Sequence, residues 1–143
     1  MTPDEFRRFG HQVVDWIADY RATLEARPVQ TVQEPGALRA KLPAEPPLAP
    51  EPFEAVLADV ERLILPALAH FQHPRFFGYF PSNGELSSVL GDYLSTGLGA
   101  LGLNWQASPA LTELEEVVIE WMRRMTGLAA GWQGVIQDTA STG

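Results

Sequence analysis

Small hydroxyl side chains gather near the C-terminal end of the chain, in the run Asp138-Thr-Ala-Ser-Thr142. An apolar, strand-like stretch, Gly134-Val-Ile-Gln137, comes directly before them. If a helix begins here, its free backbone amides, its dipole and its hydroxyl groups suit a dianion such as a phosphate. An ordinary Ser/Thr helix cap explains the same residues without any ligand. Taken alone, the run is therefore only a weak prediction of an anion site.

A second candidate is the aromatic run Phe76-Phe-Gly-Tyr-Phe80, which Pro81 and Ser82 follow. The segment is too short and too crowded for a helix, and it indicates a loop or a short strand. Its rings could line a pocket for a flat apolar ligand, with Tyr79 and Ser82 as polar contacts. Packing inside the core is an equally good interpretation.

Two groups of titratable residues have simpler explanations. His70 and His73 stand three residues apart and could share a metal ion, but no third ligand is near beyond distant carboxylates. A role in capping or at the edge of a pocket is therefore expected in place of a metal site. Glu113, Glu115 and Glu116 are expected in the first turn of a helix, where the dipole favours acids. We therefore predict that these carboxylates are solvated.

Four amphipathic helices are predicted to position these groups, because apolar residues recur at helical spacing in four stretches. The stretches are 3–26, 53–68 with a kink or break near Pro66, 82–98, and 109–125. The pairs Thr2/Glu5 and Ser82/Glu85 have the spacing of capping boxes, Ser108 precedes Pro109 as an N-cap, and Gly127 is expected to end the last helix.

The third helix and the connection after it carry unusual residues. The glycines at 91, 97, 99 and 102 each weaken a helix by about 1 kcal/mol relative to alanine, so we expect another element to pack closely there. Trp105 follows in the connection to the fourth helix. It is expected to be a buried anchor, with contact to a neighbouring site or subunit as the alternative.

Residues 28–52 predict a stiff connector. They hold seven of the twelve prolines, and their apolar residues lack periodicity. One short turn is expected at 36–39.

Composition excludes several classes of protein. The 143 residues suffice for one ordinary domain, and a net charge of −8 opposes nucleic-acid binding. No apolar run is long enough to span a bilayer, and the N-terminus lacks a signal-peptide pattern. The absence of cysteine fits a reducing compartment, so a cytoplasmic location is expected. Since the chain ends on a strand and a helix cap, we expect it to be part of a larger fold.

In their order and in their residues, these segments resemble the N-terminal part of the group II pyridoxal-phosphate-dependent decarboxylases, the aromatic-L-amino-acid decarboxylase family. The likeness covers essentially the whole chain. The residues that carry it are Glu5-Phe-Arg-Arg8, Val32-Gln-Glu-Pro-Gly36, Phe76-Phe-Gly-Tyr-Phe-Pro81, Trp105-Gln-Ala-Ser-Pro-Ala110, Thr112-Glu-Leu-Glu115, Gly134-Val-Ile-Gln137 and Ala140-Ser141.

The resemblance implies a fold. The complete protein would be an α/β enzyme of fold type I, an obligate homodimer whose N-terminal helices swap over the partner subunit. This chain would be mainly α. Residues 1–81 would form the helical dimerisation arm with its connector, and residues 82–143 would begin the large domain that binds pyridoxal 5'-phosphate.

The resemblance also implies site residues. Thr139, Ala140 and Ser141 match the segment that receives the cofactor phosphate. Tyr79, Phe80, Pro81 and Ser82 match residues that border the substrate pocket, and Leu101 and Leu103 match residues that reach into the partner's pocket. Asn83-Gly84-Glu85 and Asp138 depart from the family pattern.

The catalytic residues of such enzymes match nothing in this chain. The lysine that binds the cofactor covalently lies far beyond residue 143 in relatives, as do the histidine over the ring and the aspartate at the pyridine nitrogen. Lys41 is the only lysine here, and it lies in the connector outside every matching motif. We therefore predict that residues 1–143 alone are inactive.

Three functions follow from these patterns. The first is decarboxylation of an L-amino acid, expected to be aromatic, by the complete enzyme. The second is an aldehyde synthase of the same family, which shares the cofactor site. The third is a helical dimerisation module without catalysis, which the matching segments disfavour.

Overall fold

The computed structural model describes residues 1–79 and 84–137, and it divides the chain into two compact units, 1–84 and 85–143. Each unit is described by itself. The described residues are helices, turns and extended segments, without a named strand among them. Within this described part, no helix is both long enough and apolar enough to cross a membrane.

The first unit begins with helix α1, Pro3–Thr23, followed by a 3₁₀ turn at Leu24–Ala26. Its capping box is confirmed: the Glu5 amide donates to Thr2 Oγ1 at 3.2 Å, and the Thr2 amide donates to the Glu5 carboxylate at 2.7 Å. These bonds hold the pKa of Glu5 below its usual value. The predicted helix of 3–26 is correct in extent, with a tighter last turn.

Helix α2, Phe53–Asp59, continues as a π-helical turn, Val60–Ile64, and a 3₁₀ turn, Leu65–Ala67. The predicted break near Pro66 is confirmed. Proline lacks the amide hydrogen that would continue the helix. Leu63 in the π-helical turn and Leu65 in the 3₁₀ turn are both buried.

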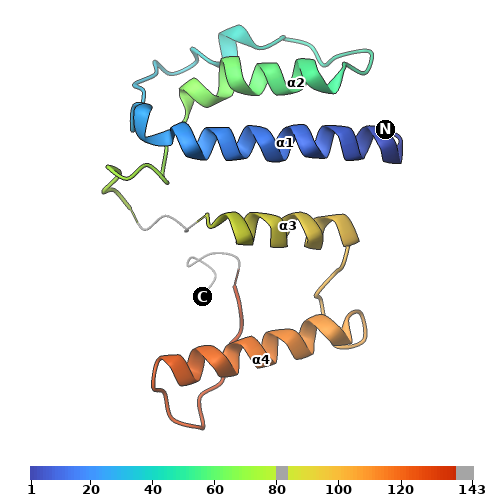
Figure 1. The fold of residues 1–143 in the computed structure, drawn as a ribbon, viewed down its shortest axis with the longest axis vertical. Helices are drawn as coiled ribbons and strands as arrows, with labels where there is room; N and C mark the ends of the chain where they lie inside the picture. The colour runs from blue at the N-terminus through green and yellow to red at the C-terminus, as the bar shows by residue number, and fades with distance from the viewer. Residues whose placement is uncertain (80–83, 138–143) are drawn as a thin grey trace. The chain divides into compact units, whose positions relative to one another are not determined.

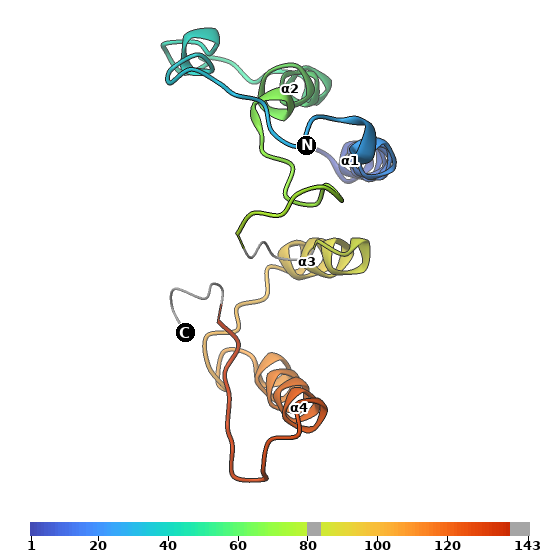
Figure 2. The same ribbon diagram turned by 90° about the vertical axis from the view of Figure 1, so that its left-hand side faces the viewer.

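Helices α1 and α2 lie side by side and run parallel (Figures 1 and 2). The Phe9 and Phe53 rings, near the two N-terminal ends, are 4.7 Å apart. At the other end, Tyr20 contacts His70, which lies just beyond the last turn after α2. Phe9 is buried, as is Leu24, so the small core of this unit runs along the seam between the helices.

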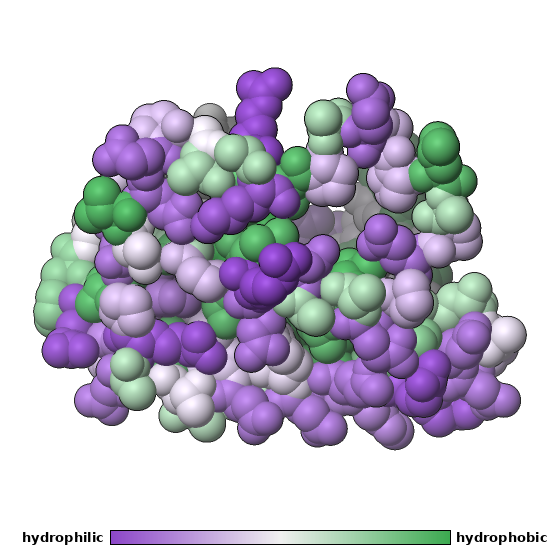
Figure 3. Space-filling model, turned by 90° about the horizontal axis from the view of Figure 1, so that it is seen from above, coloured by the Kyte–Doolittle hydropathy of each residue, from purple (hydrophilic) through white to green (hydrophobic). Residues whose placement is uncertain are grey.

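Parallel helices require a connector that returns along their full length, and residues 28–52 do this. The expected turn is confirmed, with Gly36 at φ +87° and a short 3₁₀ turn, Arg39–Lys41. Gln30 forms an isolated antiparallel bridge with Ala69, and the His70 amide donates to the Val29 carbonyl at 2.9 Å. The face seen in Figure 3 is mainly hydrophilic, with hydrophobic side chains scattered over it.

The second unit holds helices α3, Leu86–Leu98, and α4, Pro109–Met125. The prediction that Ser82 caps this helix, with Glu85 in its first turn, is wrong. Glu85 itself is the N-cap residue, with extended ψ of 138°, and the helix begins at Leu86. Gly84 directly before it does not favour another helical turn. Ser82 lies outside the described residues.

Close packing on the glycines of α3 is not provided by the described residues. Nothing among them lies within 4 Å of the position that a Cβ would take at Gly91 or Gly97. Every residue from 85 to 107 is exposed, and Trp105 retains 51% of its surface. The expectation of a buried Trp105 is therefore wrong within this chain.

Helix α4 begins and ends where the sequence predicts. Pro109 is its first residue, and Ser108 precedes it, although the Ser108 hydroxyl makes no capping bond. At the other end the Gly127 amide donates to the Arg124 carbonyl, and the Leu128 amide to the Arg123 carbonyl, both at 3.1 Å. With Gly127 at φ +73°, this is a Schellman motif.

Candidate functional site

The predicted site residues divide into described and undescribed ones. Tyr79, Leu101 and Leu103 are described. Phe80, Pro81 and Ser82, and likewise Thr139, Ala140 and Ser141, lie outside the described residues. The roles of all these residues stay predictions, and the structure shows the contacts of the described residues that precede them in the chain.

The aromatic segment is a surface feature. Phe76 lies edge-on to Phe71 at 5.0 Å between ring centres, and it stacks with Tyr79 at 6.4 Å. Tyr79 is 87% exposed, and Phe77 is exposed as well. Core packing is therefore the wrong interpretation for these two rings.

Tyr79 also has an unusual backbone. Its φ of +57° makes it the one non-glycine residue with positive φ in the described part of the chain. A bulky side chain in this left-handed region costs of order 1–3 kcal/mol, and such strain concentrates at functional sites. Tyr79 directly precedes residues 80–82, which the sequence places in the predicted pocket.

Two buried histidines hold the start of this segment against the end of α1. The Tyr20 hydroxyl and His70 Nδ1 are 2.9 Å apart. His73 Nδ1 accepts from the Arg75 amide at 3.0 Å, so Nε2 carries the proton and donates to the Arg27 carbonyl at 3.1 Å. These hydrogen bonds tie both rings to the end of the first helical segment. The described residues include no group of three or more His, Asp or Glu side chains placed to hold a metal ion.

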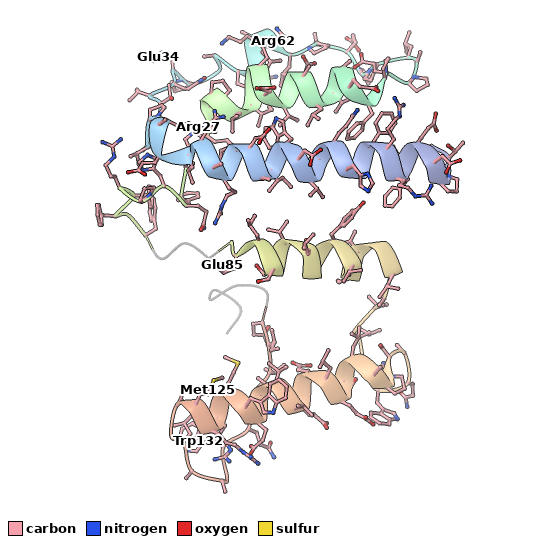
Figure 4. The ribbon with its side chains drawn as sticks, viewed as in Figure 1. Arg27, Glu34, Arg62, Glu85, Met125 and Trp132 are labelled. Atoms are coloured by element: carbon pink, nitrogen blue, oxygen red, sulfur yellow. The ribbon has the colours of Figure 1, made fainter. Side chains whose placement is uncertain are left out.

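The surroundings of His70 favour its neutral form. Burial, and secondly the neighbouring Arg27 and His73, lower the pKa of His70 from its ordinary value of 6.5. The Arg27 guanidinium lies 5.4 Å from the Tyr20 ring centre, where a cation–π interaction is favourable. Figure 4 shows Arg27 at the end of the first helical segment, where the chain turns into the connector.

The second segment, 134–137, returns onto α4. After Gly127 the chain turns back and crosses the helix, and Figure 4 shows Trp132 beside the helix's C-terminal end. Residues 134–137 have no regular secondary structure, so the strand predicted for them does not form among the described residues, where no second strand lies beside it. An open groove of about 510 Å³ lies between it and the helix, lined by Thr112, Glu115, Glu116, Ile119, Trp132 and Val135, among others.

Glu115 makes a contact that the sequence did not predict. Its Oε1 accepts a hydrogen bond from the Ile136 amide at 2.8 Å. The expectation that the acids at 113, 115 and 116 occupy the first turn is wrong, because Pro109 starts the helix and its first turn holds no acid. Since the two partners are 21 residues apart, no local pattern could have paired them.

Leu101 and Leu103 lie in the connection between α3 and α4. They are 66% and 71% exposed, so each presents most of its apolar surface to its surroundings. Gly102 between them approaches Leu111 of α4, where a Cβ would lie 3.5 Å from Leu111 Cδ1.

Comparison with known proteins identifies relatives along the whole chain. The family model described as "Pyridoxal-dependent decarboxylase conserved domain" matches residues 35–143. Tyrosine/DOPA decarboxylase 1 of Papaver somniferum is 44% identical over 97% of this chain. The chain spans 29% of that relative's length.

Solved structures of similarly named enzymes also match this chain along most of its length. The crystal structure of Catharanthus roseus tryptophan decarboxylase with L-tryptophan matches 99% of this chain and 31% of its own, at a TM-score of 0.92 and 37% identity. The crystal structure of Rhodiola rosea 4-hydroxyphenylacetaldehyde synthase matches 90% of this chain and 28% of its own chain, at a TM-score of 0.85 and 43% identity. The predicted fold class, a helical segment of a fold type I enzyme, is confirmed by this likeness.

Proposed function

Because this chain belongs to the pyridoxal-dependent decarboxylase family, we propose that it is the N-terminal segment of an enzyme that decarboxylates aromatic L-amino acids. The observation that carries the proposal is the exposed aromatic segment that ends at the strained Tyr79. Flat apolar rings held outside the core suit an aromatic side chain. The relatives named tyrosine and tryptophan decarboxylase support this choice of substrate.

Pyridoxal 5'-phosphate would be held through Thr139, Ala140 and Ser141. The donor set fits the group, since two hydroxyls and successive backbone amides are what a phosphate dianion requires. The described residues before them support this placement, because the Ile136 amide is hydrogen-bonded to Glu115 of α4. When bound, the cofactor accepts the electron pair left at Cα as carbon dioxide departs.

This chain's own contribution would be binding and orientation. Tyr79, Phe80, Pro81 and Ser82 would border the substrate ring and exclude water from it. A fixed substrate keeps its carboxylate aligned for cleavage. No residue of this chain is assigned a catalytic role, and Lys41 lies in the connector at an exposed position.

The complete enzyme is proposed to be a cytoplasmic homodimer. Residues 1–81 would form the arm that swaps over the partner subunit, and 82–143 would begin the cofactor domain. Exposed apolar side chains along α3, together with open space at Gly91 and Gly97, support a further surface that packs there. Leu101 and Leu103, both exposed, would then reach the partner's pocket.

An aldehyde synthase is the second candidate, and the likeness to the Rhodiola rosea enzyme favours it. Product analysis separates the two. The full-length protein is incubated with L-tyrosine, L-tryptophan or L-dihydroxyphenylalanine, and amine, aldehyde and oxygen uptake are measured. Amine and carbon dioxide without oxygen uptake support the decarboxylase, and aldehyde with oxygen uptake supports the synthase. If neither amine nor aldehyde forms, the result supports the non-catalytic module.

The phosphate site has its own test. Ser141→Ala should weaken cofactor affinity by about 1–3 kcal/mol through a lost charge-assisted hydrogen bond. Ser87→Ala, at an exposed position on α3, is the matched control. Affinity is measured by titrating the cofactor-free full-length protein with pyridoxal 5'-phosphate, and an unchanged constant removes Ser141 from the site.

A further inference from the structure

One face of α4 carries two side chains that hold the segment 134–136. Glu115 and Ile119 are four residues apart, so they project from the same side of the helix. Glu115 Oε1 accepts from the Ile136 amide at 2.8 Å. Ile119 meets Gly134, where an added Cβ would lie 3.1 Å from Ile119 Cγ2 and 3.3 Å from its Cδ1.

These two contacts are of different kinds and act on the same short segment. The glycine allows the backbone to approach Ile119 more closely than any other residue could. The carboxylate then binds one particular amide, which sets the register of the segment along the helix. A hydrogen bond from an amide to a charged acceptor is stronger than a neutral one. The chain is thereby fixed three residues before Thr139.

We infer that Glu115 is a positioning residue for the phosphate-binding segment: it holds the Ile136 amide on α4, three residues before the first residue proposed to bind the phosphate. The inference rests on the proposed function. Glu115 is assigned no contact with the cofactor, and it acts through the backbone at Ile136. An error of about 1 Å in such a segment is enough to misalign donors for a phosphate.

The test uses the full-length, cofactor-free protein and three variants. Glu115→Ala removes the acceptor, Glu115→Gln keeps an acceptor oxygen at the same place, and Glu113→Ala removes an exposed acid of the same helix that does not line the groove. Titration with pyridoxal 5'-phosphate gives the dissociation constant. The ³¹P resonance of the bound phosphate reports whether its surroundings have changed.

We expect Glu115→Ala to raise the dissociation constant about tenfold and to shift the ³¹P resonance. Glu115→Gln should stay within about threefold of the unchanged protein, since the Ile136 amide keeps its acceptor. Glu113→Ala should match the unchanged protein. Equal weakening by Ala and Gln, or wild-type affinity and resonance in the Ala variant, would overturn the inference.

A second pair of variants keeps the inference testable if Glu115→Ala does not fold. Gly134→Ala places a methyl against Ile119 and should also raise the dissociation constant, and adding Ile119→Ala should reverse part of that rise. If Gly134→Ala binds the cofactor as tightly as the unchanged protein, the position of this segment does not matter and the inference fails.

Failure of the inference and failure of the proposed function are distinguishable. If the full-length protein does not bind pyridoxal 5'-phosphate, the proposed function is wrong, and if Ser141→Ala binds it normally, Ser141 is not part of the phosphate site. If Ser141→Ala weakens binding while the Glu115 variants do not, the site stands and only the positioning role is lost.

Discussion

At the scale of single residues, two buried histidines hold the aromatic segment in place through hydrogen bonds. His70 is buried against Tyr20, and His73 is bonded at both ring nitrogens. Both hold the segment that leads to Tyr79. The junction therefore links the end of α1 to the residues proposed to contact substrate.

The pH dependence of stability follows from His70. Its pKa is lowered in the folded state, so between that value and 6.5 the unfolded chain binds more protons. Stability from this group is complete above about pH 6.5 and is lost as the pH falls through the folded-state pKa. In urea unfolding of the full-length protein at pH 5–8, His70→Asn should flatten this decline. His11→Asn, exposed on α1, should leave the decline unchanged.

Tyr79 should matter more to substrate than to stability. Tyr79→Gly removes the strain of positive φ but adds freedom to the unfolded chain, so the free energy of unfolding should change by less than about 1 kcal/mol. Loss of the ring should raise KM for L-tyrosine about tenfold in the full-length enzyme. Phe77→Gly, at the neighbouring exposed ring, separates a specific effect from a general one, and an unchanged KM for Tyr79→Gly would contradict the proposed pocket.

At the scale of elements, residues within a few positions of a helix boundary explain where α1 begins and where the helical stretch after α2 and helix α4 end. The capping box begins α1, Pro66 ends the helical stretch after α2, and the Schellman motif ends α4. Near that last end, Glu120 binds both Arg123 and Arg124 at 2.7 Å. Hydrogen bonds from these arginines lower the pKa of Glu120 to about 2, so the cluster stays ionised at all moderate pH values.

Gly127 should be sensitive to substitution. At φ +73°, Gly127→Ala forces a Cβ into the left-handed region and should reduce the free energy of unfolding by about 1 kcal/mol. Gly131→Ala is the matched control, because open space surrounds that position and its φ is not in the left-handed region. Chemical denaturation of the full-length protein measures both, and equal effects would contradict the role of the motif.

At the scale of the whole molecule, the two units differ in how much they bury. The first unit has a small core at Phe9, Leu24, Leu63 and Leu65. Among residues 85–137 none is buried, and large apolar side chains on both α3 and α4 are exposed. Apolar surface of this extent is normally covered by other protein.

Residues 1–143 expressed alone should therefore self-associate, and they should bind no pyridoxal 5'-phosphate covalently. Light scattering after size exclusion measures the first property, and absorbance of the cofactor after dialysis measures the second. A monodisperse monomer would contradict the exposure seen in α3 and α4. Release of carbon dioxide from an aromatic amino acid by this segment would contradict the absence of a catalytic residue.

The sequence by itself determined the features that depend on neighbours within one helical turn. The starts of α1 and α4, the break at Pro66, the turn at Gly36 and the end at Gly127 are local choices of backbone conformation, so residue type and spacing suffice. The resemblance to the decarboxylases also rests on the sequence alone, because the order of the short segments and the residues within them carry it.

Only the tertiary structure decided which distant groups meet. The Tyr20–His70 contact spans 50 residues and the Glu115–Ile136 contact spans 21. The exposure of Trp105 and Tyr79 likewise depends on what packs beside them. Such contacts follow from the path of the whole chain: helices α1 and α2 run parallel because the connector returns along them, and 134–136 meets α4 because Gly127 turns the chain back.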